Sequence, residues 1–281
     1  MQFEKLTFDN LKTLVGWAQQ EGWNPGPYDA RVFWETDPDG FWGYREEGKL
    51  IAGGALVSYD GLFGFMGLFI VHPDHRSKGI GRELWYQRRD MLLARLNEDA
   101  SIGMDGVLDM QPFYAKGGFE IAYRDERHGR TGEAMSLDPA ISPVDATDFE
   151  SISHYDEKCF GFPRPQFLRP WLKVPGTRAL KFVLEDEMKG FAVLRKAHVG
   201  YKICPLFADN LMVAEELYKA CLNSVPGEPV YLDIPMANPD AVALVNKFDT
   251  EYVFECARMY HGPAPRVALE KVFGITTFEL G

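Results

Sequence analysis

The feature that most constrains the fold is the segment from Val71 to Arg82, which reads as a strand end, a loop with two glycines and a helix start. The run before it, residues 63–71, is apolar and aromatic and carries no charge, as a buried strand does. Apolar residues after it, from Leu84 to Leu96, recur at the spacing of an amphipathic helix. Four arginines fall between them and are expected on the polar face: Arg82, Arg88, Arg89 and Arg95.

The loop has the properties of a phosphate cradle. Gly79 and Gly81 lack a Cβ, so the backbone can turn sharply there and approach a bulky anion. The first N–H groups of the helix have no partner within it, and with the helix dipole they suit a pyrophosphate. Arg76, Lys78 and Arg82 add positive charge. A plain strand-to-helix connection can also carry glycines and exposed basic residues, so the glycine pair alone is weak evidence.

The complete pattern is more specific than the glycine pair. A strand ending in Val-x-Pro and followed by Arg-x-x-Gly-x-Gly resembles the coenzyme A loop of the GNAT superfamily of N-acetyltransferases. The residues of this chain that match the pattern are Val71, Pro73, Arg76, Gly79 and Gly81. Downstream, residues 113–119 resemble the Tyr-x-Lys-x-Gly-Phe segment of the same family. The resemblance covers residues 1 to about 135.

The resemblance implies acetyl-coenzyme A as the acyl donor and requires no metal. In that family the strand at residues 67–72 splays from the strand at 101–107, and the thioester lies in the gap. Backbone N–H groups of the splayed strand then bind the donor, and the glycine loop binds its pyrophosphate. The donor-binding residues that this implies are Phe69, Ile70, Val71, Arg76, Ser77, Lys78, Gly79, Ile80, Gly81, Arg82 and Tyr114.

Two catalytic residues follow from the resemblance. Tyr114 stands where the family protonates or hydrogen-bonds the leaving thiolate, although a core tyrosine is the plain alternative. Asp105, in the strand that borders the gap, is the candidate base acting through water, or else a solvated strand-end aspartate. The family often has an asparagine seven residues before the tyrosine. Here that residue is Val107, which puts the start of the following helix in doubt.

Other residues near these motifs allow two interpretations. His72 could titrate near neutrality, but a histidine before Pro73 is more often simply exposed. Trp23, Phe33 and Trp34 could line an acceptor pocket, whereas an aromatic cluster of this kind is more often core.

Composition narrows the class of protein. A chain of 281 residues with 46% hydrophobic residues can bury two cores. A net charge of −11 argues against nucleic acid as a partner and is compatible with a cationic substrate. No apolar run approaches the roughly 20 residues of a membrane span, and the N-terminus has no export signal, which favours a cytoplasmic protein. The four cysteines form no Cys-x-x-Cys pair and are expected to be buried thiols rather than metal ligands.

The chain order predicts a mixed α/β protein. The sheet is expected to be mostly antiparallel, with helices on both faces. In the first half, strands are expected at residues 3–8, 41–44, 50–59, 63–71, 101–107 and 119–124, and Asp9 or Asn10 is expected to cap the first helix. Two prolines near residues 137–144 indicate a domain boundary. We expect a catalytic GNAT domain at 1–138 and a second domain at 139–281.

The second half repeats the first without its active features. The segment 201–210 stands where the phosphate loop belongs, but it has no glycine. Asp233 corresponds to Asp105, and Asn238 opens a segment like Asn-x-x-Ala-x-x-x-Tyr-x-Lys in which the tyrosine position is Val245. We therefore expect a degenerate GNAT-like domain that cannot hold coenzyme A, rather than an unrelated α/β cap.

Together these observations favour an N-acetyltransferase. The acetyl group would pass directly to the primary amine of a small molecule in a ternary complex, near the cleft between the domains. The alternative is a module that binds acyl-coenzyme A without turnover, as a sensor or an interaction protein. Neither interpretation involves nucleic acid or a membrane.

Overall fold

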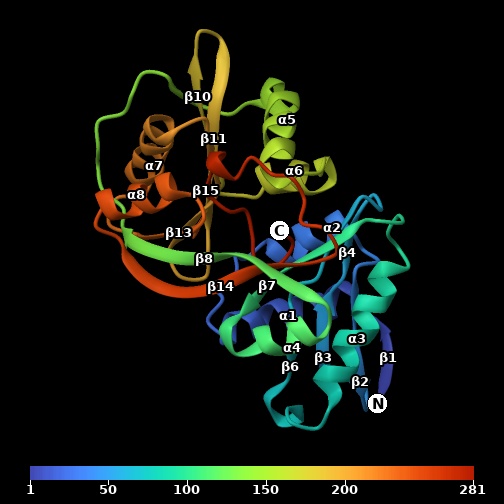
Figure 1. Cartoon of the computed structure of the whole chain (residues 1–281). Coiled ribbons are helices and arrows are strands. Elements are labelled where there is room, and N and C mark those ends of the chain that lie inside the picture. The colour runs from blue at the N-terminus through green and yellow to red at the C-terminus, as the bar shows by residue number, and fades with distance from the viewer. The chain divides into compact units, whose positions relative to one another are not determined.

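The computed structural model describes residues 1–281 and has the expected mixed α/β fold (Figure 1). The chain forms two compact units. Unit 1 comprises Met1–Glu120, Met259–Ala264 and Phe278–Gly281, and unit 2 comprises Ile121–Arg258 and Pro265–Thr277. This division falls earlier than the expected boundary at 138, because residues 125–131 pair with a strand of the second unit. None of the helices combines the length and apolar composition that crossing a bilayer would require.

Unit 1 contains two groups of strands. One sheet has the order β1-β2-β3-β6, and its neighbours are antiparallel. The strands β4, β5 and β7 are consecutive neighbours in the other sheet, where β5 and β7 are parallel. Their bounds are β1 Gln2–Lys5, β2 Phe41–Glu46, β3 Lys49–Ala55, β4 Val57–Tyr59, β5 Phe63–Phe65, β6 Ile70–Val71 and β7 Ser101–Val107. The end of β14 belongs to unit 1 as well, where Tyr260 packs on Phe63.

The strand expected at residues 63–71 changes its partner halfway. β5 pairs with β7, and the last hydrogen bond to that strand runs from Met66 N to Gly103 O at 2.9 Å. After residues 66–69 the chain pairs with β3 instead, with Ile70 opposite Gly53. Leu68, between the two pairings, has φ of +48°, in the left-handed region that non-glycine residues seldom adopt. The strand therefore parts from β7 where the sequence predicted a splay.

Helices cover both faces of β3. A Cβ added at Gly53 would contact Leu14 of α1, whereas one added at Gly54 would meet Arg88 of α3. Successive residues of a strand point to opposite faces, so α1 and α3 lie on opposite sides of the sheet. The helices of unit 1 are α1 Phe8–Gln20, α2 Asp29–Thr36, α3 Ile80–Leu93 and α4 Gln111–Lys116, with 3-10 turns at Pro73–His75 and Leu108–Met110.

The cap of α1 differs from the expected one. Thr7 caps the helix, and its hydroxyl accepts a hydrogen bond from Asn10 N. The Asn10 side chain accepts one from Thr7 N in return, which completes a capping box. Asn10 therefore takes part in the cap from the third helical position, and the helix begins at Phe8, three residues earlier than a cap at Asn10 would allow.

The segment Phe278–Gly281 packs in unit 1 against β4 and the splayed strand. The Tyr59 hydroxyl donates to the carbonyl of Leu280 at 2.8 Å. The backbone of Glu279 lies so close to Gly67 that a Cβ there would be 1.9 Å from the Glu279 carbonyl oxygen. Position 67 therefore requires glycine for this packing.

We expect Gly67→Ala to lower the free energy of unfolding by about 1–3 kcal/mol, because the added methyl group overpacks a backbone contact. The matched control is Gly16→Ala on α1, where a Cβ would meet nothing within 4 Å. That change is expected to be neutral or stabilising, since alanine favours helix. Urea unfolding of both variants measures the difference, and equal stability would contradict the packing described for Gly67.

Unit 2 is built on one mixed sheet. Its strands run β14-β8-β13-β12-β11-β10-β9, and β15 also pairs with β12. The bounds are β8 Phe119–Thr131, β9 Ile141–Pro143, β10 Arg178–Leu184, β11 Glu187–Lys196, β12 Tyr201–Ala208, β13 Pro229–Pro235, β14 Glu251–His261 and β15 Val272–Gly274. The helices are α5 Phe149–Phe160, α6 Pro165–Leu172, α7 Leu211–Ser224 and α8 Pro239–Lys247, with 3-10 turns at Ala146–Asp148 and Leu269–Lys271. Figure 1 shows α5 and α6 on the other side of β11 from α7.

Candidate donor-binding and catalytic site

The glycine loop ends at the start of α3. Gly79 has φ of +83° and occupies the N-cap position, where no side chain caps the helix. The first hydrogen bond in the helix runs from Glu83 N to Gly79 O at 3.2 Å. The N–H groups of Ile80, Gly81 and Arg82 therefore have no acceptor within the helix. This is the geometry of an anion site at a helix N-terminus.

Two of the predicted basic residues hold the loop itself. Arg76 Nε donates to Val71 O at 2.9 Å, and the same guanidinium pairs with Glu21. Lys78 Nζ donates to Asp74 O at 2.7 Å, and Ser77 between them has φ of +62°. The ion pair with Glu21 therefore partly neutralises Arg76. The hydrogen bond to Val71 O fixes the path of the chain from the strand to the helix.

The helix approaches the splayed strand closely at Gly81. A Cβ there would lie 3.2 Å from Val71 Cγ2 and 3.5 Å from Phe69 Cζ. In the ladder with β3, His72 N donates to Ile51 O. Because successive amides of a strand point to opposite sides, the Val71 N–H points away from β3 and the Ile70 N–H toward it. Of these two predicted residues, Val71 is the one whose amide faces the side that β7 has left.

Tyr114 is held between α3 and β7. Its ring stacks on Trp85 of α3 with centroids 6.0 Å apart, and a Cβ at Gly106 of β7 would be 3.0 Å from the ring. Trp85 is itself fully buried. Burial raises the pKa of Tyr114 to about 12, so its hydroxyl stays protonated at neutral pH. A protonated hydroxyl is what a proton donor to a leaving group requires.

The start of α4 does not depend on the missing asparagine. A 3-10 turn at Leu108–Met110 leads into the helix, and Gln111 Nε2 donates to Gly106 O at 3.0 Å. Gln111 therefore ties the beginning of α4 to β7.

Asp105 is half-buried on the same strand, next to Gly106, against which Tyr114 packs. Because successive residues of a strand point to opposite faces, the Asp105 side chain lies on the other face of β7 from Tyr114.

The residues near the motifs are mostly structural. Phe33 is fully buried in the core, and the half-buried Trp34 stacks on Phe41 with ring centroids 6.2 Å apart. His72 is partly exposed and packs beside Trp17 at 5.3 Å between ring centroids. All four cysteines are buried free thiols, as the sequence predicted.

Arg88 was expected on the polar face of its helix, and this expectation is wrong. The side chain is fully buried, with its guanidinium 5.4 Å from the centroid of the Phe69 ring. The spacing could have revealed it, because Arg88 lies four residues after Leu84 and four before Leu92, both of which are buried. Residues four apart share a helix face, so Arg88 continues the buried stripe.

Unit 2 lacks a comparable loop. Only Asp209 and Asn210 separate β12 from α7, and the Asn210 side chain accepts from Val213 N at 3.1 Å. A side chain therefore occupies the helix N-terminus that is uncapped in unit 1. Asp233, the counterpart of Asp105, is buried in a two-point ion pair with Arg127 at 2.6 and 2.7 Å.

A strand of the chain itself lies beside the end of β12. β15 pairs with β12 through Leu206 and Phe207, and Ile275 N donates to Asp233 O on β13 at 2.8 Å. A Cβ at Gly274 would be 2.4 Å from Leu232 Cδ1. The space between the ends of β12 and β13 is therefore filled by protein.

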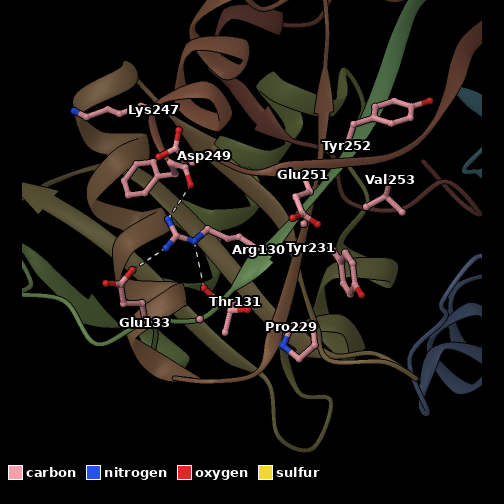
Figure 2. Close-up of a pocket in the computed structure, with 13 residues that line it drawn as sticks. Arg130, Thr131, Glu133, Pro229, Tyr231, Lys247, Asp249, Glu251, Tyr252 and Val253 are labelled. Atoms are coloured by element: carbon pink, nitrogen blue, oxygen red, sulfur yellow. Dashed lines mark hydrogen bonds and ion pairs between the residues drawn. The ribbon is translucent and has the colours of Figure 1, made fainter.

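Unit 2 does contain a pocket of about 850 Å³ between the C-terminal end of α8 and the neighbouring ends of β8 and β14 (Figure 2). Arg130, which lines this pocket, already has hydrogen-bond and ion-pair partners within the protein. Arg130 donates to the carbonyls of Thr131 and Phe248 at 3.2 and 3.0 Å, and it pairs with Glu133 at 2.7 Å. The pocket thus offers neither a glycine loop nor an uncommitted arginine to a phosphate.

The splayed strand, the uncapped helix N-terminus and the buried tyrosine are the features that the sequence resemblance led us to expect in unit 1. Comparison with known protein families supports the resemblance to GNAT acetyltransferases. The model described as "Acetyltransferase (GNAT) family" matches residues 8–119, and the one described as "Acetyltransferase (GNAT) domain" matches residues 152–274. The chain therefore belongs to the GNAT family of acyltransferases, as a member with two GNAT domains.

Individual proteins support this assignment. The chain is 29% identical to holothin acyltransferase of Pseudoalteromonas sp. (strain SANK 73390) over 268 residues, which are 94% of this chain and 89% of the relative. A crystal structure of a proposed acetyltransferase from Pyrococcus horikoshii superposes with a TM-score of 0.84 at 23% identity, covering 100% of this chain and 95% of that one. A tandem GNAT protein from the clavulanic acid biosynthesis pathway gives a TM-score of 0.66 at 15% identity, with 94% and 99% covered.

Proposed function

We propose that this chain transfers an acetyl group from acetyl-coenzyme A to a primary amine of a small molecule, by direct attack in a ternary complex. The observation that carries the proposal is the uncapped start of α3 beside the splayed strand. A Cβ at Gly81 would contact Val71 and Phe69, so the glycine lets the start of the helix lie close to the splayed strand. A pyrophosphate at the helix start and a pantetheine arm along the strand would both meet backbone N–H groups.

The donor would occupy unit 1 along the splayed strand. The N–H groups of Ile80, Gly81 and Arg82 bind the pyrophosphate, and Lys78 and Arg82 add charge near it. The Val71 N–H, which points away from β3, donates to the pantetheine arm or to the thioester carbonyl. A donor held there also stabilises the oxyanion that forms on attack.

The reaction then needs three proton movements. A water molecule held by Asp105 takes the proton from the ammonium form of the acceptor, and the free amine attacks the thioester carbon. A C–N bond forms, which leaves the nitrogen positively charged, and the nitrogen gives up its extra proton to water. The C–S bond breaks, and its electron pair leaves with the sulfur. Tyr114, protonated at neutral pH, donates to that sulfur. No covalent intermediate with the protein is required, because holding both reactants in line supplies much of the rate.

The test is release of free coenzyme A thiol from acetyl-coenzyme A across a panel of small amines. Holothin belongs in the panel because the relative that aligns over most of this chain is named for its acylation. Acceptor-dependent thiol release, with the N-acetyl product identified by mass spectrometry, supports the proposal. Binding of acetyl-coenzyme A without turnover on any amine would favour the sensor instead.

We expect one donor site per chain. The first turn of α7 is capped by Asn210, and β15 fills the space between β12 and β13, so unit 2 offers no second cradle. Calorimetric titration with acetyl-coenzyme A is expected to give a stoichiometry of one. A stoichiometry of two would contradict the assignment of unit 2 as degenerate.

A further inference from the structure

Arg88 is a buried cation in unit 1 that forms no ion pair. Its Nη2 atom donates to Gly67 O at 2.8 Å and also to Ala55 O. Its Nε and Nη1 atoms are buried and have no hydrogen-bond partner. Burying a guanidinium without a counter-charge is costly, and orphaned buried donors are rare in folded proteins. These unused donors and the uncompensated charge call for an anion that the protein chain does not provide.

The cation lies at the splay. Gly67 is in the segment that leaves β7, and Ala55 ends β3, so one nitrogen of Arg88 bridges β3 and the segment that splays from β7. The chain also makes room for it, because a Cβ at Gly54 would be 2.3 Å from the guanidinium carbon. Phe69, a predicted donor-binding residue, lies against the same guanidinium.

Tyr114 of α4 is near enough to Arg88 for its ionised form to attract the guanidinium. Burial lowers the pKa of Arg88 to about 9, and the interaction with Tyr114 opposes that shift. The guanidinium is therefore still positive at neutral pH. A negative charge that develops near the Tyr114 hydroxyl would be attracted to it, and the buried surroundings strengthen such an attraction.

We propose that Arg88 stabilises the coenzyme A thiolate that leaves when the acyl group is transferred. The inference rests on the proposed function, in which Tyr114 faces the sulfur of the donor. As the C–S bond breaks, the electron pair stays on sulfur, and Arg88 compensates that charge until the sulfur takes the proton of Tyr114. A neighbouring cation lowers the pKa of a thiol and favours the thiolate.

The experiment compares the binding of coenzyme A with that of desulfo-coenzyme A, which lacks the thiol. At about pH 8 the wild-type protein is expected to prefer coenzyme A, and the preference should grow by about tenfold for each further unit by which the thiol pKa falls once it lies below about 8. Arg88→Met should bind desulfo-coenzyme A like the wild type and lose this preference, whereas Arg88→Lys should keep most of it. A folded Arg88→Met variant with an unchanged preference would overturn the inference.

A second measurement does not depend on any variant. The ultraviolet absorbance of the thiolate, followed against pH, is expected to show a lower thiol pKa for bound coenzyme A than for free coenzyme A. An equal or higher pKa in the bound state would rule out thiolate stabilisation by Arg88. Failure of the wild-type protein to bind either analogue would instead refute the donor site itself, so the two proposals are tested separately.

Discussion

Gly81→Glu is expected to abolish binding of acetyl-coenzyme A while the protein remains folded. The new side chain would start 3.2 Å from Val71 Cγ2 and fill the approach between helix and strand. Its carboxylate would also face the pyrophosphate. Two like charges about 4 Å apart repel by about 4 kcal/mol at an effective dielectric constant of about 20. That energy corresponds to a loss of affinity of about a thousandfold.

The fold is expected to tolerate this substitution. Position 81 is the second residue of α3, and an acidic residue in the first turn of a helix interacts favourably with the dipole. Gly81→Ala is the matched control, because its methyl group makes the same first contact without the charge. Calorimetric titration should show nearly normal binding for the alanine variant. If a folded Gly81→Glu protein bound acetyl-coenzyme A with wild-type affinity, the loop would not be the pyrophosphate site.

Tyr114→Phe is expected to reduce kcat by about a hundredfold, the scale of general acid catalysis, and to leave donor affinity nearly unchanged. Phenylalanine keeps the stack on Trp85 and the contact with Gly106, so only the hydroxyl is lost. Since the pKa of Tyr114 is about 12, its ionisation should not limit the wild-type rate below about pH 10. Steady-state kinetics across this pH range measure both effects.

Tyr218→Phe is the control for loss of a buried tyrosine hydroxyl. Tyr218 lies on α7 in unit 2, where burial also raises its pKa, and it has no place in the proposed chemistry. Its variant should keep the wild-type kcat. A Tyr114→Phe enzyme as fast as the Tyr218→Phe enzyme would exclude Tyr114 as the proton donor.

The local features of the site could be predicted because neighbouring residues determine them. The positive φ of Gly79, the helix that begins at Ile80 and the apolar strand before the loop all follow from residue types at short spacing. The same holds for the repeat in the second half, where Asn210 stands in place of the loop. These features also carried the resemblance to the GNAT family, which the family comparison confirmed.

Long-range packing decided the rest. Nothing near Gly67 in sequence predicts that Glu279 will lie against it, and nothing near Leu206 predicts that β15 will pair there. The strand at residues 63–71 was predicted as one element because its apolar character is continuous, yet it changes partner at residues 66–69. Hydrophobicity marks a segment as buried without specifying which neighbour buries it.

Arg88 is the clearest example of a residue whose place in the structure the sequence did not predict. The sequence alone determined the amphipathic helix, the glycine cradle and the two-domain plan, since each depends on residues close together in the chain. Only the tertiary structure placed a charged side chain inside the core, because β3, the splayed strand and α4 converge on it from three separate parts of the chain. The environment of a buried charge is set by such distant groups, which no local pattern contains.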